Sequence, residues 1–131
     1  MPSAPESVSV GKASAGRLTT HVLDTTCGRP AAGVGLTLFA LDGLDRRVLL
    51  KIATNEDGRC DAPLLSGDAF KAGHYEIVFE VAQYFRAAGI KLSNPPFLDD
   101  VPIRFSLADE SAHYHVPLLI SPYGYSTYRG S

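Results

Sequence analysis

An all-β sandwich is the fold class that this sequence predicts. Seven or eight short runs alternate apolar and polar residues, as strands do when one face meets a core. Turn residues separate these runs at close spacing, and a single run has helical spacing. Strands and helices do not alternate along the chain, so a parallel sheet is not supported. We therefore expect antiparallel sheets packed face to face.

The first strand follows a small, polar leading segment. Residues 1–16 are rich in serine, proline and glycine, and such ends seldom bury enough area to offset their ordering entropy. We expect a flexible tail there. Alternation then begins at Leu18 and continues through Leu23. It places His21 on the face of this strand opposite Val22.

The next three strands include a hairpin. Residues 34–41 form a run that is apolar on both sides, a turn begins at Asp42 and Gly43, and residues 48–54 continue as a third strand. A loop flanked by glycines follows. The alternating run at 75–81 is then the fourth strand.

One segment changes period and predicts the helix. Val81, Tyr84, Phe85 and Ala88 are spaced i, i+3, i+4, i+7. Gly89 follows where a left-handed residue would end the helix. We expect this to be the only helix.

The last three strands close the domain. Residues 103–107 alternate, and two further runs at 113–121 and 123–129 are separated by Pro122. So short a link favours an antiparallel hairpin. Pro117 lies inside the first of these two runs and has no N–H to donate to a sheet, so we expect a local irregularity there.

Length, charge and hydropathy limit the classes of function. A chain of 131 residues is one domain, over 17–131, with little room for a deep cleft of its own. Twelve basic against fourteen acidic residues leave no positive surplus for nucleic acid. The sequence has neither the long apolar stretch of a membrane span nor an apolar signal-peptide core, so we expect a cytoplasmic protein without membrane partners.

Histidines are the first candidates for chemistry. His113 and His115 stand two residues apart in a predicted strand and project from one face, where they could share a metal or a substrate. A metal site needs a third ligand, so a solvated pair is the simpler interpretation. His21 is equally consistent with a half-buried strand histidine that has a satisfied hydrogen bond.

Arg59 and the two cysteines allow more than one interpretation. Arg59 ends a turn, where it is either solvated or a guanidinium that holds carbonyl groups or an oxyanion. Cys27 and Cys60 are too few and too widely spaced for a disulfide framework or a four-thiolate zinc site, so we expect free thiols. Beside Arg59, Cys60 is either a thiolate nucleophile or an inert buried residue.

The end of the sequence is unusually aromatic. Tyr123, Tyr125 and Tyr128 fall within six residues, and the sequence then closes on Ser131. Clustered aromatics of this kind indicate packing, an interface or stacking on sugars. We expect the last residue to lie near Tyr128.

Three segments carry a family resemblance. They read LTTHVLDTTCGRPAAGV at 18–34, TNEDGR at 54–59 and HYHVPLLISPYGYSTYRGS at 113–131. With them the chain resembles the transthyretin-related 5-hydroxyisourate hydrolases of urate degradation. The closing YRGS is the feature that separates these hydrolases from the hormone-carrying transthyretins.

The resemblance implies a fold and an assembly. It implies a transthyretin-like sandwich of two four-stranded sheets with one short α-helix. It also implies a homotetramer, a dimer of dimers with active sites in the channel at the dimer–dimer interface.

The resemblance also implies the site residues. Four residues match catalytic positions: His21, Arg59, His115 and Ser131. Tyr128 matches a substrate-binding position, and the resemblance assigns substrate binding to His21 and Arg59 as well. His113 matches a position to which we assign no catalytic role. The two histidines would activate or orient water jointly, and Arg59 would bind carbonyls and offset negative charge.

The implied reaction is hydrolysis of the cyclic amide of 5-hydroxyisourate to 2-oxo-4-hydroxy-4-carboxy-5-ureidoimidazoline, with no metal or organic cofactor. The alternative is a transthyretin-like carrier that binds a small aromatic ligand in the tetramer channel. A carrier is expected to lack the two histidines and YRGS, and this sequence keeps them.

Overall fold

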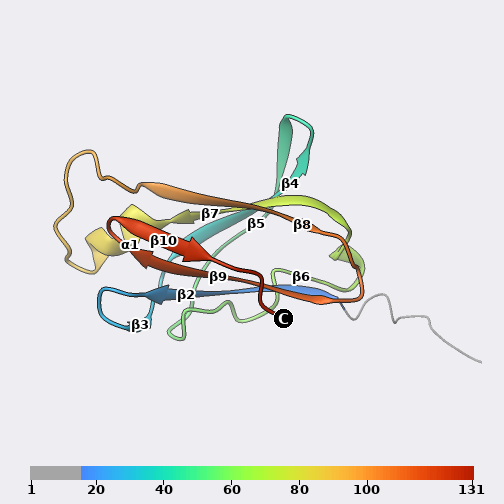
Figure 1. The fold of residues 1–131 in the computed structure, drawn as a ribbon, viewed down its shortest axis with the longest axis horizontal. Helices are drawn as coiled ribbons and strands as arrows, with labels where there is room; N and C mark the ends of the chain where they lie inside the picture. Colours follow the sequence, from blue (N-terminus) through green and yellow to red (C-terminus); the bar gives the residue numbers. More distant parts are fainter. Residues whose placement is uncertain (1–15) are drawn as a thin grey trace, which may run out of the picture.

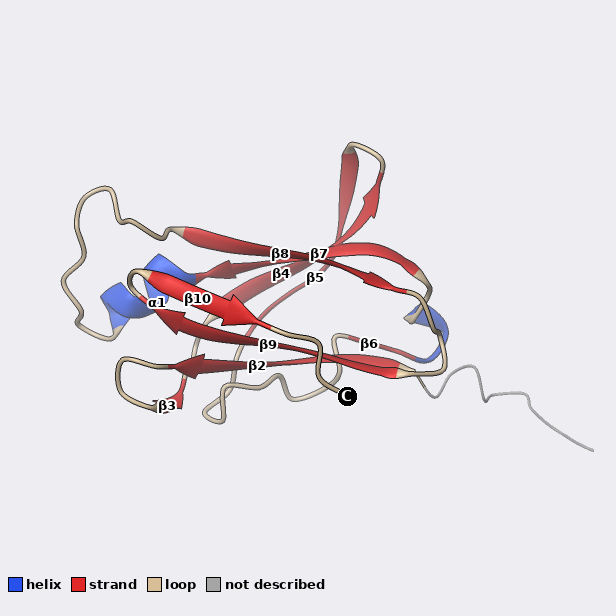
Figure 2. Ribbon diagram, viewed as in Figure 1, coloured by secondary structure: helices blue, strands red, loops and turns tan. Residues whose placement is uncertain are grey.

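The protein is a two-layer β-sandwich in which a short helix lies at one end (Figures 1 and 2). The computed structural model describes residues 16–131. The tail expected over 1–16 lies outside the described residues except for Gly16, which is buried. A Cβ at Gly16 would come within 2.4 Å of the Phe70 ring, so this glycine belongs to the packed domain. In the described part of the chain, no helix is long and apolar enough to cross a membrane.

The first sheet has five strands, in the order β10, β9, β2 and β3, with β6 also paired to β2. The strands are β2 (Arg17–Asp24), β3 (Arg29–Pro30), β6 (Leu65–Ser66), β9 (His113–Ser121) and β10 (Gly124–Thr127). The sheet has five strands rather than the expected four because β3 and β6 pair with opposite ends of β2. The middle of that edge of β2 is left for an isolated bridge between His21 and Arg59.

The second sheet has the four expected strands and is antiparallel throughout, in the order β5, β4, β7 and β8. The strands are β4 (Gly35–Asp42), β5 (Asp45–Ala53), β7 (Gly73–Glu80) and β8 (Asp100–Leu107). The β4–β5 hairpin projects beyond the body of the sandwich (Figure 1). Its pairing shifts register between Leu38 and Phe39.

The sandwich and most of its pairings confirm the sequence-based prediction, but one central pair is parallel. Strand β2 runs parallel to β9, with Thr19 opposite His115 and His21 opposite Pro117. The reason is topological. The whole second sheet lies between these two strands along the chain, so no hairpin forces them to run in opposite directions.

The predicted helix is confirmed as α1 (Val81–Ala87), and a short 3-10 turn forms at Gly67–Ala69. Gly89 follows α1 at φ +84°, the left-handed conformation expected of a residue that ends a helix. The helix buries Phe85 completely. On the same helix, Tyr84 donates a hydrogen bond of 2.8 Å to Asp24, which ties α1 to the end of β2.

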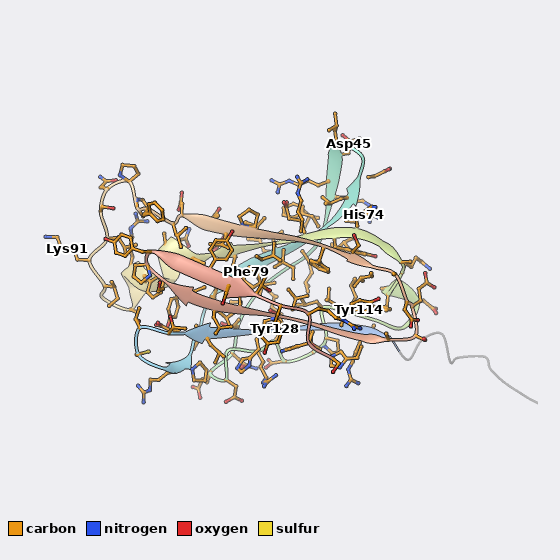
Figure 3. The ribbon with its side chains drawn as sticks, viewed as in Figure 1. Asp45, His74, Phe79, Lys91, Tyr114 and Tyr128 are labelled. Carbon is orange, nitrogen blue, oxygen red and sulfur yellow. The ribbon has the colours of Figure 1, made fainter. Side chains whose placement is uncertain are left out.

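The core lies between the two sheets, where Phe79 is fully buried (Figure 3). Burial of one such side chain contributes about 1.5 to 3 kcal/mol. On β2, Leu18 and Val22 are buried in this core, while Thr19 and His21 alternate with them on the outer face. The outer face of the first sheet is therefore where β2 presents Thr19 and His21, whereas Thr20 and Asp24 are buried.

Pro117 interrupts the pairing of β9 with the last residues, as expected. His115 and Gly130 exchange both backbone hydrogen bonds. Hydrogen-bonded pairs recur every second residue in an antiparallel ladder, so Pro117 falls where an N–H would be needed next. The ladder breaks there, and the Thr127 hydroxyl instead donates to the Pro117 carbonyl at 2.6 Å. Unlike most strand prolines, Pro117 lies in a strand that is paired on both sides.

Candidate active site

A polar cavity of about 530 Å³ opens on the outer face of the first sheet. This volume is within the usual range for small-molecule sites. Three of the five predicted site residues line the cavity: Arg59, His115 and Ser131. Thr19 and His113 line it as well. The cavity thus gathers residues from β2, from β9, from the turn after β5 and from the end of the chain.

The turn before Arg59 is fixed by the side chain of Asn55. Its Oδ1 accepts hydrogen bonds from the backbone N–H groups of Asp57, at 2.9 Å, and Arg59, at 3.1 Å. The Asn55 carbonyl also accepts a hydrogen bond from the N–H of Gly58, and the Asn55 N–H donates to the Arg59 carbonyl. Because these bonds close the turn on itself, the guanidinium starts from a rigid base rather than from a mobile loop.

Gly58 connects this turn to the sheet. Its φ is +75°, and a Cβ there would lie 2.4 Å from the carbonyl oxygen of Val22. The Gly58 carbonyl accepts the N–H of Val22 at 2.8 Å. Only glycine permits this close approach, so the sequence Asp57-Gly58-Arg59 is what holds Arg59 against the middle of β2.

His21 lies beside Arg59 but outside the cavity wall. Its Nε2 is 2.9 Å from the carbonyl oxygen of Asp57, which can only accept, so Nε2 carries a proton and Nδ1 is bare in the neutral ring. Burial and then the Arg59 cation lower the pKa of His21, against smaller opposing effects of Asp57. His21 is therefore a neutral neighbour of the cavity whose free nitrogen is Nδ1.

His115 is the central side chain of the cavity. Its Nδ1 lies 2.8 Å from Oγ1 of Thr19. Burial lowers the pKa of His115, and the positive charges of Arg59, His113 and His21 lower it further. The ring is therefore neutral near pH 7, which is the form that can accept a proton.

The last residues are held against β9 by three contacts. The backbone of Gly130 donates to the His115 carbonyl at 2.7 Å and accepts from its N–H at 3.2 Å. Arg129 donates to the His113 carbonyl at 3.3 Å, and its guanidinium lies 4.3 Å from the centre of the Tyr114 ring. These contacts carry Ser131 into the cavity wall.

Tyr128 does not reach this cavity within one protomer. Its side chain is exposed, and it lines a separate cavity of about 260 Å³ together with Tyr114 and Arg129. The residue falls opposite Pro117, where the ladder is broken. The structure thus brings Arg59, His115 and Ser131 together, places His21 beside them, and leaves Tyr128 apart.

The two cysteines are free thiols, as expected. Cys60 lines the cavity, but burial and the neighbouring Asp61 raise its pKa. A thiol with a raised pKa is a poor nucleophile at neutral pH, so this environment favours the inert interpretation of Cys60. Among residues 16–131, no three His, Cys, Asp or Glu side chains are arranged to hold a metal ion.

The cavity also contains residues to which the sequence assigned no function. The alternation of β2 shows that Thr19 shares a face with His21. The position of Thr19 beside His115, however, depends on the parallel pairing of β2 with β9. His113 shares a face with His115 and is equally close to Thr19. Only the parallel register reveals that these three side chains form one cluster.

Fold and cavity together define a transthyretin-like β-sandwich that presents histidine and arginine side chains on the outer face of one sheet. The family model described as "HIUase/Transthyretin family" matches residues 18–130. The chain belongs to this family.

Relatives and solved structures agree with this assignment. The 5-hydroxyisourate hydrolase of Mesorhizobium japonicum is 64% identical over 120 residues, which cover 92% of this chain and 96% of the relative. The structure of Klebsiella pneumoniae 5-hydroxyisourate hydrolase is 35% identical with a TM-score of 0.72, over 88% of this chain and 94% of that one. Sea bream transthyretin in complex with thyroxine is 26% identical with a TM-score of 0.78, over 87% and 94%.

A structure of (S)-allantoin synthase also matches, with 44% identity and a TM-score of 0.84. The match covers 88% of this chain but only 44% of the synthase chain. The similarity therefore concerns less than half of that longer protein.

The lowered pKa values of the two histidines predict how activity depends on pH. A general base must be neutral, so activity falls where that base becomes protonated. Because the pKa values of His21 and His115 are both lowered from 6.5, we expect the acid limb of kcat/KM to have its midpoint below pH 6.5. Initial rates from pH 5 to 8, corrected for the uncatalysed reaction, measure it. A midpoint above 6.5 would contradict a base in this environment.

Proposed function

We propose that this protein hydrolyses 5-hydroxyisourate to 2-oxo-4-hydroxy-4-carboxy-5-ureidoimidazoline. The observation that carries the proposal is the convergence of Arg59, His115 and Ser131 on one cavity in a chain that is 64% identical to a 5-hydroxyisourate hydrolase. A neutral base, a fixed cation and a hydroxyl are the groups that water attack on a cyclic amide requires.

Water activation is the first step of the proposed mechanism. His115 takes a proton from water on the ring nitrogen that Thr19 does not occupy, while the water oxygen forms a bond to the ring carbonyl carbon. His21, whose free nitrogen is Nδ1, helps to orient the water from the neighbouring strand. Base catalysis of this kind contributes about 10² to 10⁴-fold to the rate.

Charge stabilisation is the second element. Attack of water places negative charge on the former carbonyl oxygen, and the Arg59 guanidinium offsets it with directed N–H donors. The amide C–N bond then breaks. The imidazolium of His115 returns its proton to the departing nitrogen, so the base is regenerated and the proton count balances.

Substrate orientation is assigned to the remaining residues. Ser131 lines the cavity, where its hydroxyl can bind a polar group of the ring. Tyr128 is exposed just after the end of β10 and is proposed to contact substrate bound in a neighbouring protomer. This arrangement accounts for a substrate-binding tyrosine that does not reach the cavity of its own chain.

We also propose that the working unit is a homotetramer with its sites between dimers. The cavity lies on an outer sheet face, which no second layer of the described chain covers. Tyr128, three residues before the cavity residue Ser131, is exposed as well. A second subunit is the natural source of the missing wall. Light scattering and specific activity, both followed on dilution, test whether activity falls as the tetramer dissociates.

The direct test generates 5-hydroxyisourate in place with urate oxidase and follows its ultraviolet absorbance. The protein should accelerate the loss of the intermediate above its spontaneous decay. No acceleration by a folded sample would overturn the assignment and favour the carrier, which binds without turnover. Identity to sea bream transthyretin is only 26%, against 64% to the Mesorhizobium japonicum hydrolase, so the comparisons favour the hydrolase.

Removal of the last three residues tests the role of the chain end. Deletion of 129–131 eliminates the backbone pairing of Gly130 with His115 and removes Ser131 from the cavity. We expect kcat/KM to fall by at least about 100-fold, because small displacements of a catalytic group are costly. Replacement of Tyr125 by phenylalanine changes strand β10, which precedes the deleted residues and does not line the cavity, and serves as the control. Normal turnover by the truncated protein would show that the chain end is not part of the site.

A further inference from the structure

One hydroxyl joins two imidazole rings at the edge of the cavity. Oγ1 of Thr19 lies 2.8 Å from Nε2 of His113 and 2.8 Å from Nδ1 of His115. The three side chains come from two parallel strands and are all half-buried. The cluster therefore fixes the Nδ1 side of the His115 ring and leaves Nε2 without a partner in the cluster.

Counting protons limits how these hydrogen bonds are made. The Thr19 hydroxyl has one proton to donate and two lone pairs to accept with, so at least one of the two rings must donate to it. If Thr19 donates to His115, then His115 carries its proton on Nε2. In the two other arrangements, His115 donates from Nδ1 and its Nε2 is bare.

The surroundings of His115 select between these tautomers. Arg59 is the charged group with the largest effect on His115, and both residues line the cavity. Because Nδ1 is occupied by Thr19, Nε2 is the ring nitrogen left for groups in the cavity. A bare Nε2 offers a lone pair to the positive charge of Arg59, whereas an N–H would offer a positive end, so the arginine disfavours the Nε2–H form. Among residues 16–131, no hydrogen bond is made to His115 Nε2, which leaves this atom free for water.

We propose that Thr19 is a positioning residue for the hydrolysis: it accepts the Nδ1–H of His115 and so keeps Nε2 bare as the acceptor of the water proton. His113 completes the arrangement by occupying the other side of the Thr19 hydroxyl. The catalytic consequence rests on the proposed function, whereas the tautomer does not.

The role of Thr19 grows during the reaction. When His115 takes the proton of water, its ring becomes a cation and the bond from Nδ1–H to Thr19 becomes charge-assisted. Hydrogen bonds to charged groups contribute about 1.5 to 3 kcal/mol, which corresponds to about 10- to 100-fold in rate. Loss of the hydroxyl should therefore lower kcat by this factor and change KM much less.

Two variants and a matched control test the proposal through kcat. Thr19→Val removes the hydroxyl at nearly constant volume, and Thr19→Ser retains it. Ser106→Ala is the control, since the Ser106 hydroxyl bonds His74 at 2.8 Å outside the cavity. We expect the 10- to 100-fold loss for valine, near-normal kcat for serine and no change for the control.

The direction in which the acid limb of the pH profile moves in Thr19→Val distinguishes this role of Thr19 from a merely structural one. The charged groups that act on His115 are Arg59, His113 and His21, and Arg17, Cys60 and Asp61 also line the cavity. None of these residues changes in Thr19→Val. An acceptor at Nδ1 favours the protonated ring, so its loss should move the acid limb to lower pH. A donor at Nδ1 would favour the neutral ring, and its loss would move the limb to higher pH.

Nitrogen NMR of the wild-type protein decides the tautomer without any variant. A protonated Nδ1 and a bare Nε2 on neutral His115 are expected; the opposite assignment overturns the proposal even if Thr19→Val fails to fold. Normal kcat with an unchanged acid limb in folded Thr19→Val also overturns it, and the hydrolase assignment then stands. If the wild type does not accelerate 5-hydroxyisourate decay, the proposed function fails, and the NMR result still tests the tautomer.

Discussion

Replacement of His115 by alanine should bring the decay of 5-hydroxyisourate close to its spontaneous rate, with kcat lowered by about 10² to 10⁴-fold. His115 lines the cavity together with Arg59, whose charge lowers its pKa, and among residues 16–131 no hydrogen bond is made to its Nε2. Its lowered pKa keeps it neutral at the pH of the assay. Stopped-flow or conventional absorbance, read against a blank without protein, gives the effect.

The variant must be shown to fold, because His115 also lies in a central strand. Its backbone bonds to Gly130 do not involve the imidazole, so circular dichroism and the unfolding midpoint should stay close to those of the parent protein. His74→Ala is the matched control: this ring is likewise bonded to a hydroxyl, but outside the cavity. Rates like those of the parent protein in folded His115→Ala would remove His115 from the mechanism.

Reversal of charge at Arg59 should have an effect of similar size. Loss of one well-placed donor to a developing oxyanion costs about 10² to 10³-fold in kcat, and Arg59→Glu adds repulsion of the same negative charge. A carboxylate at this position should also raise the pKa values of His115 and His21, because the Arg59 cation lowers both. We therefore expect a low kcat together with an acid limb displaced to higher pH.

A nearby arginine provides the control for this second variant. Arg29 is exposed on β3, which pairs with the same edge of β2, and it does not line the cavity. Arg29→Glu makes the same change in net charge and should leave turnover unchanged. Equal losses in the two variants would mean that overall charge, rather than the guanidinium of Arg59, governs the rate. Arg59→Gln then separates loss of the donor from repulsion.

Much of the fold follows from short-range patterns in the sequence. The alternation from Leu18 to Leu23 reports that one face of β2 is buried, and that signal also places His21 on the outer face. The helix α1 (Val81–Ala87) is specified by its spacing and by Gly89. Each of these features is local, because a few neighbouring residues determine backbone geometry and burial together.

The parallel pairing of β2 with β9 could not be predicted in the same way. It joins residues about a hundred positions apart, such as Thr19 and His115, and no turn residue signals its direction or register. The motif resemblance named His115 but could not show that Thr19 bonds it. The irregularity at Pro117 could be predicted from the sequence, because a missing N–H breaks the hydrogen-bond ladder wherever the partner strand lies.

The positions of Tyr128 and Ser131 show a related limit. Both belong to the closing motif, yet only Ser131 lines the cavity of its own protomer. A motif names residues that act together but does not say on which chain each one acts. The broken pairing opposite Pro117 and the open outer face of the sheet are properties of the folded chain.

The most direct test is the observed rate constant of 5-hydroxyisourate decay at several protein concentrations, with substrate in large excess over protein. A catalyst turns over many times, so we predict a rate constant that rises in proportion to protein and a slope that vanishes in the double variant Arg59→Glu, His115→Ala. A rate that does not rise with protein, or a slope that survives in the folded double variant, would contradict hydrolysis in this cavity.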